Sequence, residues 1–336
     1  FMMEYIDVDT VSSIPLNSKI EISTKTNGNI FKGYAENRSI ERTATSHTMQ
    51  LSGRGLTRDL MDGAAMMRQS QLPATYQLLT KMMCDGKGVQ YTYKPGSDKQ
   101  PLTGGINIGV NESAFTILER AARYEGYLIY DSWDGKFIVS VPQTALVASI
   151  TANMVTQASI NETVADRFYE YIIVRSPNSV ANSPDDEIIE DGIAKDAYSE
   201  GMNTNRKMVV VNSRSDGTID YSQRLAQWYA NRAYGKSLSL ELVIPAWTYK
   251  AGKYWDINQC VNVEIPGVYQ TSVTHKPLLI SEVTLSFSIQ NGTEARLRLT
   301  YPEAYSIEPL QISPNAASNF GIPNSNIGMK TNISDG

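Results

Sequence analysis

The feature that most constrains the fold is a strict alternation of apolar and polar residues in the C-terminal third of the chain. Four runs carry it, at residues 238–244, 261–265, 283–289 and 297–301. A period of two places every apolar side chain of a run on one face of a β-strand. Asn291-Gly292 separates the last two runs, and this dipeptide is a strong hairpin signal. Strands with one apolar face must close on themselves or pack on another layer, so we expect a small barrel or sandwich over residues 236–302.

A weaker form of the same pattern lies near the N-terminus. Ile20 and Ile22 alternate with polar residues, Asn27-Gly28 predicts a turn, and a later strand carries Met49 and Leu51. Both β regions begin with a turn that leads into a strand, and both end with a later strand. This likeness suggests an internal duplication, with two related barrels in one chain.

The periodicity becomes helical between the two β regions. We expect helices over residues 73–83 and 113–124, followed by strands over 127–130 and 136–141. A further helix, residues 221–234, begins at a pair resembling a capping box, Asp220 and Gln223. We expect Gly235 to end that helix.

These elements predict an α+β fold, mainly antiparallel β, with two β-barrel domains, which the family resemblance described below identifies as tube-like, and a small inserted α/β domain. The first barrel would comprise residues 1–70 and 150–215, the insert residues 71–149, and the second barrel residues 216–309. Residues 310–336 lack periodicity and are expected to form an extended tail ordered by a partner. Residues 177–205 are rich in Ser, Asn, Asp and Gly, which indicates a long exposed loop.

Composition and charge exclude several classes of protein. A net charge of −5 argues against a protein that wraps nucleic acid, because such a surface needs cations to displace counterions. Cys84 and Cys260 lie far apart without a CxxC partner, so we expect two buried thiols and no disulfide framework. His47 and His275 lack the spacing of a metal site, and no run is long and apolar enough to span a membrane. We therefore expect no cofactor, no metal and no membrane insertion.

Two motifs could carry chemistry, and each has a plainer interpretation. Residues 53–60, with Gly53 and Gly55, hint at a phosphate loop but lack its full pattern, so we expect a strand, a tight turn and a short helix with Leu60 and Met61. Asp166 and Glu170 could serve as a carboxylate pair in glycan hydrolysis.

The plainer interpretation places both carboxylates at the start of a strand, with Arg167 paired to one of them. The acidic run Asp185–Glu187 is expected to be a solvated loop, because it lacks the spacing of a calcium site. We assign no catalytic, cofactor-binding or metal-binding residue.

Three stretches, in their order and spacing, carry a resemblance to a known family: residues 51–62, 166–171 and 247–255. The chain resembles the baseplate hub proteins of Mu-like contractile-tailed phages, which are related in fold to the hub region of type VI secretion spike proteins. The resemblance runs over about residues 15–310, and Pro302–Tyr305 closes the second barrel as in that family. Family members have about one further strand pair before the position of Phe1, which would leave the first barrel incomplete.

The resemblance implies a structural, non-enzymatic homotrimer. Three chains with two barrels each would form a pseudo-sixfold ring between the sixfold tail tube and the threefold central spike. Implied partners are further copies of the chain, the tail tube protein or tube initiator, the spike and the baseplate wedge proteins, with DNA only in transit. The implied location is the virion tail baseplate, assembled in the host cytoplasm.

A ring that passes DNA should not retain it, so we expect a polar to acidic lumen. Charged residues make up only 19% of the chain, and 19 Tyr against 7 Phe fit a surface largely covered by other protein. Two alternatives stay open. One is a cell-wall glycosidase that uses Asp166 and Glu170, and the other is a receptor- or glycan-binding tail protein that uses exposed Tyr and Trp.

Overall fold

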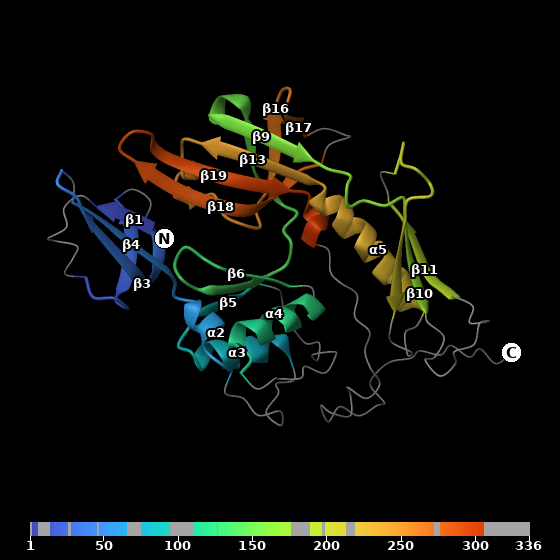
Figure 1. Ribbon diagram of the computed structural model, residues 1–336, viewed down its shortest axis with the longest axis horizontal. Helices are drawn as coiled ribbons and strands as arrows, with labels where there is room; N and C mark the ends of the chain where they lie inside the picture. The colour runs from blue at the N-terminus through green and yellow to red at the C-terminus, as the bar shows by residue number, and fades with distance from the viewer. Residues whose placement is uncertain are drawn as a thin grey trace.

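The fold was analysed in a computed structural model, in which strands dominate and helices are few (Figure 1). This confirms the expectation of a mainly antiparallel α+β fold. The described residues are 2–5, 14–25, 28–45, 47–65, 75–94, 111–125, 127–175, 189–196, 199–212, 219–271 and 276–305. No helix within these ranges is long and apolar enough to cross a membrane.

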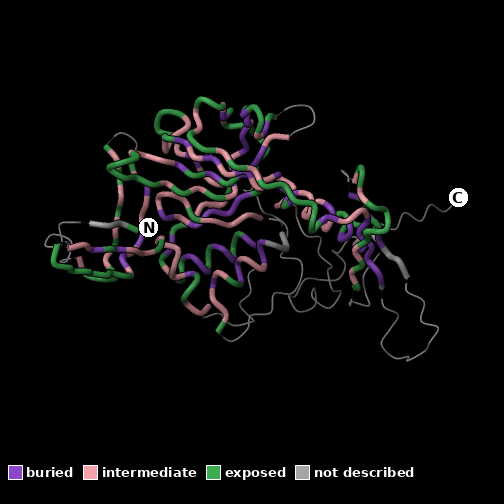
Figure 2. The backbone as a smooth tube through the Cα atoms, turned by 45° about the horizontal axis from the view of Figure 1, so that its top comes forward, coloured by how far each residue is buried: buried purple, intermediate pink, exposed green. Residues whose placement is uncertain are grey.

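The N-terminal sheet has four antiparallel strands in the order β1-β4-β3-β2. They are β1 (Met2–Tyr5), β2 (Lys19–Thr24), β3 (Gly28–Arg42) and β4 (His47–Gly55). Its small core consists of Ala35, Met49 and Leu51. Figure 2 shows that most of this sheet is exposed or half-buried. A short turn after β4 leads into helix α2 (Arg58–Asp62), which confirms the plainer interpretation of residues 53–60.

The α/β unit follows the N-terminal sheet and has its own core. It contains α3 (Tyr76–Asp85), β5 (Tyr91–Tyr93), α4 (Ala114–Glu125), β6 (Leu128–Asp131) and β7 (Phe137–Ser140). Both expected helices and both expected strands are present within a few residues of their predicted bounds. Side chains of α3 and α4 pack on Phe137 and Val139 of the central strand β7. Cys84 lies in this core, where burial raises its pKa to about 12.

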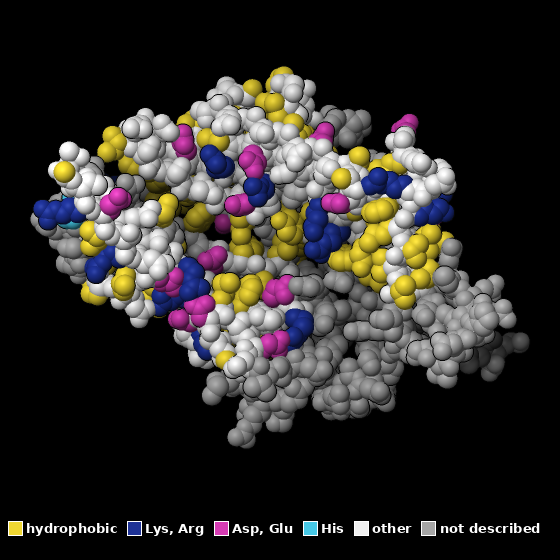
Figure 3. Space-filling model, viewed as in Figure 1, with side chains coloured by type: hydrophobic (Ala, Val, Ile, Leu, Met, Phe, Trp, Pro, Cys, Tyr) yellow, Lys and Arg dark blue, Asp and Glu magenta, His cyan; other side chains and the backbone are white. Residues whose placement is uncertain are grey.

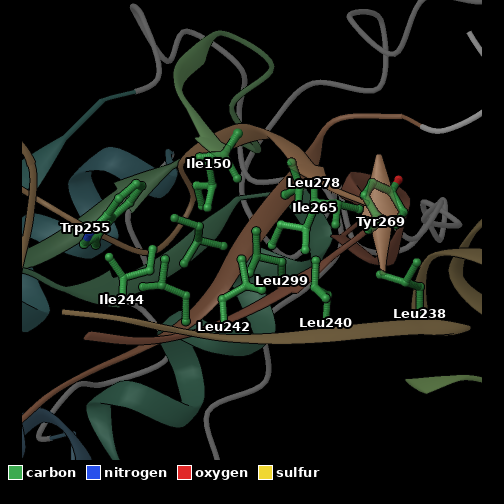
Figure 4. Packing of buried hydrophobic residues seen from close by; sticks show 14 of the residues in the cluster. Ile150, Leu238, Leu240, Leu242, Ile244, Trp255, Ile265, Tyr269, Leu278 and Leu299 are labelled. Atoms are coloured by element: carbon green, nitrogen blue, oxygen red, sulfur yellow. The ribbon is translucent and has the colours of Figure 1, made fainter. Parts of the chain in front are cut away.

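The C-terminal sheet is the largest, and it curls (Figure 1). Its strands are β8 (Leu146–Thr151), β9 (Gln157–Glu162), β13 (Leu238–Ile244), β16 (Cys260–Ile265), β17 (Tyr269–Gln270), β18 (Leu278–Ser288) and β19 (Gly292–Thr300). The alternation expected from the sequence is borne out, because every second residue of β13 is buried. Leu240, Leu242 and Leu299 point toward Ile150 and Trp255 in the core (Figure 4). The β18–β19 hairpin forms at Asn291-Gly292, and Gly292 has a positive φ of 72°.

The strand pairing of this sheet differs from the sequence grouping, which assigned residues 71–149 to the insert and residues 150–215 to the first barrel. β9 pairs antiparallel with β13, and β8 pairs in parallel with β16. Both strands therefore belong to the C-terminal sheet and not to the N-terminal one. The reason is burial, since Ile150 and Ile160 complete the same apolar core. The domain boundaries as a whole stay a prediction.

A third region joins β10 (Glu170–Arg175), β11 (Ile189–Lys195) and β12 (Lys207–Asn212) to helix α5 (Ile219–Lys236). The prediction of a loop over residues 177–205 was wrong for β11, which pairs with β10 and lies under α5. Residues 176–188, which include the acidic run Asp185–Glu187, lie outside the described residues, as do residues 306–336.

The expected end of α5 at Gly235 was also wrong, because the helix continues to Lys236. Gly235 serves a close approach of two backbones. A Cβ at this position would lie 1.9 Å from the backbone nitrogen of Ala304, in the 3₁₀ turn η3 (Pro302–Tyr305). The glycine therefore allows η3 to pack against the helix, and it is not a helix terminator.

Candidate interaction surfaces

The C-terminal sheet has one apolar face, turned to the core, and one polar face. The polar face carries the alternate residues of four neighbouring strands, β18, β19, β13 and β9. They are Glu282, Thr284, Ser286, Glu294, Arg296, Arg298, Ser239, Glu241, Val243, Gln157, Ser159 and Asn161. Six of these twelve side chains carry a hydroxyl or amide group and five are charged, so the face is hydrophilic.

The charges on the polar face largely cancel. Arg298 lies between two carboxylates of adjacent strands, with its Nη2 2.7 Å from Glu241 Oε1 and its Nη1 3.0 Å from Glu282 Oε2. The hydrogen bond to Glu241 is the main reason that the pKa of Arg298 is raised. Three carboxylates face two guanidiniums, those of Arg296 and Arg298, which leaves one net negative charge. The face is therefore polar to slightly acidic.

The β18–β19 hairpin leaves a strand edge open. β18 pairs with β16 at only two positions, Leu278 and Leu279, so its remaining outer edge meets no other described strand. Trp247 fixes the hairpin by donating from Nε1 to the carbonyl oxygens of Ser286, at 2.9 Å, and Glu294, at 3.1 Å. Beyond this point Phe287 is 66% exposed and Ile289 is 94% exposed. An open edge with apolar side chains at its tip favours pairing with another chain.

The arginines of residues 53–60, Arg54 and Arg58, form internal ion pairs, so this segment is not a phosphate loop. Arg54 Nε lies 2.8 Å from Glu36 Oε2, and its Nη1 donates to Asp62 Oδ1 at 3.0 Å. Arg58 donates to the other oxygen of Glu36 at 2.9 Å, and its guanidinium lies 3.9 Å from the centre of the Tyr34 ring. Hydrogen bonds from Arg54 hold the pKa values of both carboxyls below their usual range. The cluster therefore ties the N-terminal sheet to α2.

Asp166 and Glu170 are not arranged as a pair of catalytic carboxylates. Asp166 is exposed in a turn, whereas Glu170 is buried at the start of β10 and lies 2.6 Å from Lys207 Nζ. Arg167 pairs with neither of them, contrary to expectation. It forms a bidentate ion pair with Asp196, with N–O distances of 2.9 and 2.8 Å. Both members of that pair are buried, which indicates a structural role.

A groove of about 610 Å³ runs beside α5. Aromatic and cationic side chains line it, among them Phe168, Trp228, Tyr229, Arg232 and Lys236. In the sequence, Trp228 and Tyr229 belong to one stripe of the expected helix, and no groove is predicted there. The signal that could have revealed the groove is the continuation of this stripe, in steps of four residues, from Trp228 to Arg232 and Lys236.

Among the described residues, the structure does not bring the remaining candidates, the histidines and cysteines, together in a metal or catalytic site. Within the described ranges no three His, Cys, Asp or Glu side chains are grouped so that they could hold a metal ion. His47 begins β4 opposite Arg42, and His275 lies outside the described residues. Cys84 and Cys260 are buried and unbonded, as expected.

No protein-family model matches the chain. It is 26% identical over 278 residues to the baseplate hub protein gp44 of Escherichia phage Mu, a match covering 81% of this chain and 72% of the relative. Its fold resembles that of the 43 kDa tail protein of prophage MuSo2 from Shewanella oneidensis, with a TM-score of 0.72, 21% identity, and 91% and 90% of the two chains covered. A tail protein from Neisseria meningitidis MC58 matches with a TM-score of 0.69 and 18% identity over 92% and 89%. The expected resemblance is confirmed, and these relatives are tail components and not enzymes.

Proposed function

We propose that the chain is a structural baseplate hub protein of a contractile phage tail or a related device. The observation that carries this proposal is the match to the hub protein of phage Mu over 81% of the chain. The fold shared with two tail proteins, one of them from a prophage, over about nine-tenths of the chain supports it.

The hub acts as a homotrimer in which each chain supplies two tube-like barrel units. One unit is built on the N-terminal sheet and the other on the C-terminal sheet, which includes β8 and β9, so that three chains make a ring of six similar units. The open edge of β18 and the open ends of the sheet order, at β9 and β17, support this arrangement. Pairing between copies completes the sheets that a single chain leaves open, and it removes exposed edges.

The polar face of the C-terminal sheet lines the channel of this ring. DNA passing such a surface meets hydroxyls, amides and mutually neutralised charges, and it releases few counterions there. The wall therefore lets DNA slide without retaining it. The near cancellation of charge around Arg298 supports this role.

The ring joins the sixfold tail tube, or its initiator, to the threefold central spike, and wedge proteins bind its outer surface. Residues 310–336 act as a tail that a neighbouring component holds. The protein works in the virion tail baseplate and is assembled in the host cytoplasm.

Native mass spectrometry and electron microscopy of the purified chain test the proposal. We expect a trimer that forms a threefold ring with an axial channel. A double variant at the hairpin tip, Phe287→Asp with Ile289→Asp, should weaken the trimer. The control Leu78→Asp also places a charge at an exposed apolar position, on α3 of the α/β unit, and should leave the trimer intact. A wild-type chain that stays monomeric at high concentration contradicts the proposal.

A further inference from the structure

The groove beside α5 is lined by the helix, the segment before β10, and strands β10 and β12. One wall is the face of α5 with Trp228, Arg232 and Lys236, and the other is the segment 163–168 that connects β9 to β10. Tyr171 of β10 and Met208 of β12 complete the lining. Figure 3 shows hydrophobic side chains gathered over α5 and the β10–β11 sheet, with Lys and Arg side chains beside them.

A buried ion pair and a partly buried hydrogen bond hold the connecting segment in place. The ion pair between Arg167 and Asp196 anchors it to the end of β11. Arg206, just before β12, donates to the carbonyl oxygen of Arg167 at 2.7 Å, and its guanidinium stacks on Phe168 at 5.2 Å. The groove is therefore formed before any ligand arrives, so that binding does not have to order this wall.

The helix wall combines aromatic rings with cations that have no carboxylate partner in the described ranges. Arg232 stacks on Trp228, with its guanidinium 5.0 Å from the ring centre, and Lys236 follows one turn later. Lys236 lies in the last turn of α5, where a cation also compensates the helix dipole. Among the lining residues only Asp166 is acidic. The groove is therefore cationic although the chain has a net charge of −5.

A free strand edge borders the groove. The sheet order is β11-β10-β12, so β12 has a described neighbour on one side only. α5 packs over β10 and β11, and it leaves Met208 and Val210 of β12 only partly buried. On the opposite face of the strand, Val209 is 57% exposed and Val211 is 58% exposed. A strand added beside β12 would cover these valines and extend over the groove.

We propose that the groove and the β12 edge together bind an extended acidic peptide segment of a partner protein. The segment pairs with β12 through backbone hydrogen bonds. On one face an aromatic side chain packs against Trp228 and Tyr229, and carboxylates reach Arg232 and Lys236. On the other face, aliphatic side chains cover Val209 and Val211. Strand addition supplies the affinity, and the alternating side chains supply the specificity.

Charge complementarity and the strand edge favour a peptide over a nucleic acid. Cations beside aromatic rings could also take up phosphates and stacked bases. A nucleic acid, however, cannot pair with a free β-strand edge or cover two exposed valines. The site needs one chain only, so the inference stands whether or not the protein forms a ring.

Fluorescence anisotropy with a labelled synthetic peptide tests this inference on the full chain. The probe FVEIEVD places Phe and three carboxylates on one face of a strand and aliphatic residues on the other. Arg232→Glu should weaken binding about tenfold or more, because it turns an attraction into a repulsion. Arg224→Glu changes the charge of the same helix outside the groove lining and should change the affinity less than about twofold. Lys236→Gln provides a second test if Arg232→Glu fails to fold.

Three results would overturn the inference. The neutral peptide FVQIQVN binds as tightly as the acidic probe, Arg224→Glu weakens binding as much as Arg232→Glu, or a ten-nucleotide oligothymidine binds more tightly than the peptide. Hydrogen exchange supplies a separate readout of strand addition. Saturation with FVEIEVD should slow amide exchange in residues 207–212, and FVEPEVD, whose proline interrupts the strand, should not. Unchanged exchange in β12 with the bound acidic probe would rule out strand addition.

Discussion

The N-terminal and C-terminal sheets arise from the same alternating pattern, but they are stabilised in different ways. The C-terminal sheet encloses sixteen buried apolar residues, because its curl and the strands β8, β9 and β16 bring the apolar face back onto itself. The core cluster of the N-terminal sheet holds three, although β3 alone is 15 residues long. Sequence alternation sets the face of a strand, but a second layer is needed to make that face a core.

The two sheets are also tied to the α/β unit by different chemistry. At the C-terminal sheet the tie is Asn258, which is buried and has a φ of 63°. Its side chain accepts a hydrogen bond from the backbone nitrogen of Gln143 at 3.0 Å, and donates to Ser140 Oγ at 3.3 Å and Val141 O at 2.9 Å. At the N-terminal sheet the tie is the exposed ion-pair cluster around Arg54, which holds α2, and Leu60 of α2 lies in the core of the α/β unit. The buried hydrogen bonds of Asn258 should therefore contribute to the stability of the whole fold. The exposed ion pairs of Arg54 should contribute little to that stability and should mainly hold the N-terminal sheet against α2.

Truncating one core leucine in each sheet should give the largest difference in stability loss between the two sheets. Leu240→Ala should lower the free energy of unfolding by about 4 kcal/mol, because Leu240 is fully buried among well-packed neighbours. Leu51→Ala should cost about 2 kcal/mol, because the partly buried Ile14 and Ile20 can close the smaller cavity. Urea denaturation of both variants measures the two losses, and equal losses would refute the contrast.

Asn258→Ala should be the next most costly change, at about 3 kcal/mol. It removes all three side-chain hydrogen bonds and places alanine at a positive φ. Asn258→Gly loses the same bonds but tolerates the backbone, so it should be about 1 kcal/mol less destabilising. Thermal unfolding compares the two. If Asn258→Gly destabilises the protein as much as Asn258→Ala, the positive φ at this position contributes nothing to the loss of stability.

The two junctions with the α/β unit should respond to pH in opposite directions. Burial raises the pKa of Asp256 from 3.8 to about 6, and the nearby Asp131 adds to this, whereas Lys94 opposes it. The folded protein therefore holds this proton more tightly than the unfolded chain. The resulting stabilisation is complete below pH 4, is lost as the pH rises to about 6, and amounts to about 2 kcal/mol after allowance for solvent.

Asp256→Asn should accordingly stabilise the protein at pH 7 relative to the wild type, and this advantage should vanish near pH 4. Glu36 and Asp62 of the N-terminal cluster have lowered pKa values, so their contribution is present at pH 7 and is lost in acid. Melting temperatures of wild type and Asp256→Asn between pH 4 and 7 measure the effect. An advantage that does not depend on pH would show that ionisation of Asp256 is not its cause.

Arg54→Gln should have the smallest global effect. Its ion pairs are exposed, so we expect no measurable change in the main unfolding transition. Limited proteolysis should instead cut residues 2–55 faster, and 0.5 M salt should largely remove the difference from wild type because it screens the same contacts. A large drop in the melting temperature of Arg54→Gln would mean that the ion pairs of Arg54 contribute to global stability as the hydrogen bonds of Asn258 do.

Local signals were enough to predict many of the elements. Asn291-Gly292 predicted the β18–β19 hairpin, and helical periodicity predicted α3 and α4. β11 was missed because Glu190, Asp191 and Gly192 have low strand propensity, and the strand forms because β10 and α5 enclose it. The groove beside α5 could not be predicted as a whole, since its walls come from residues 163–168 and 228–237.

The sequence by itself determined which residues face inward along each strand and helix, because that depends on periods of two and 3.6 residues. It also carried the resemblance to Mu-like hub proteins in the order of three stretches. Only the tertiary structure decided which sheet β8 and β9 join, that Arg167 pairs with Asp196, and that Gly235 admits η3. Those outcomes depend on contacts between residues far apart in the chain. Packing and burial select among such contacts, and the local sequence pattern does not determine which of them form.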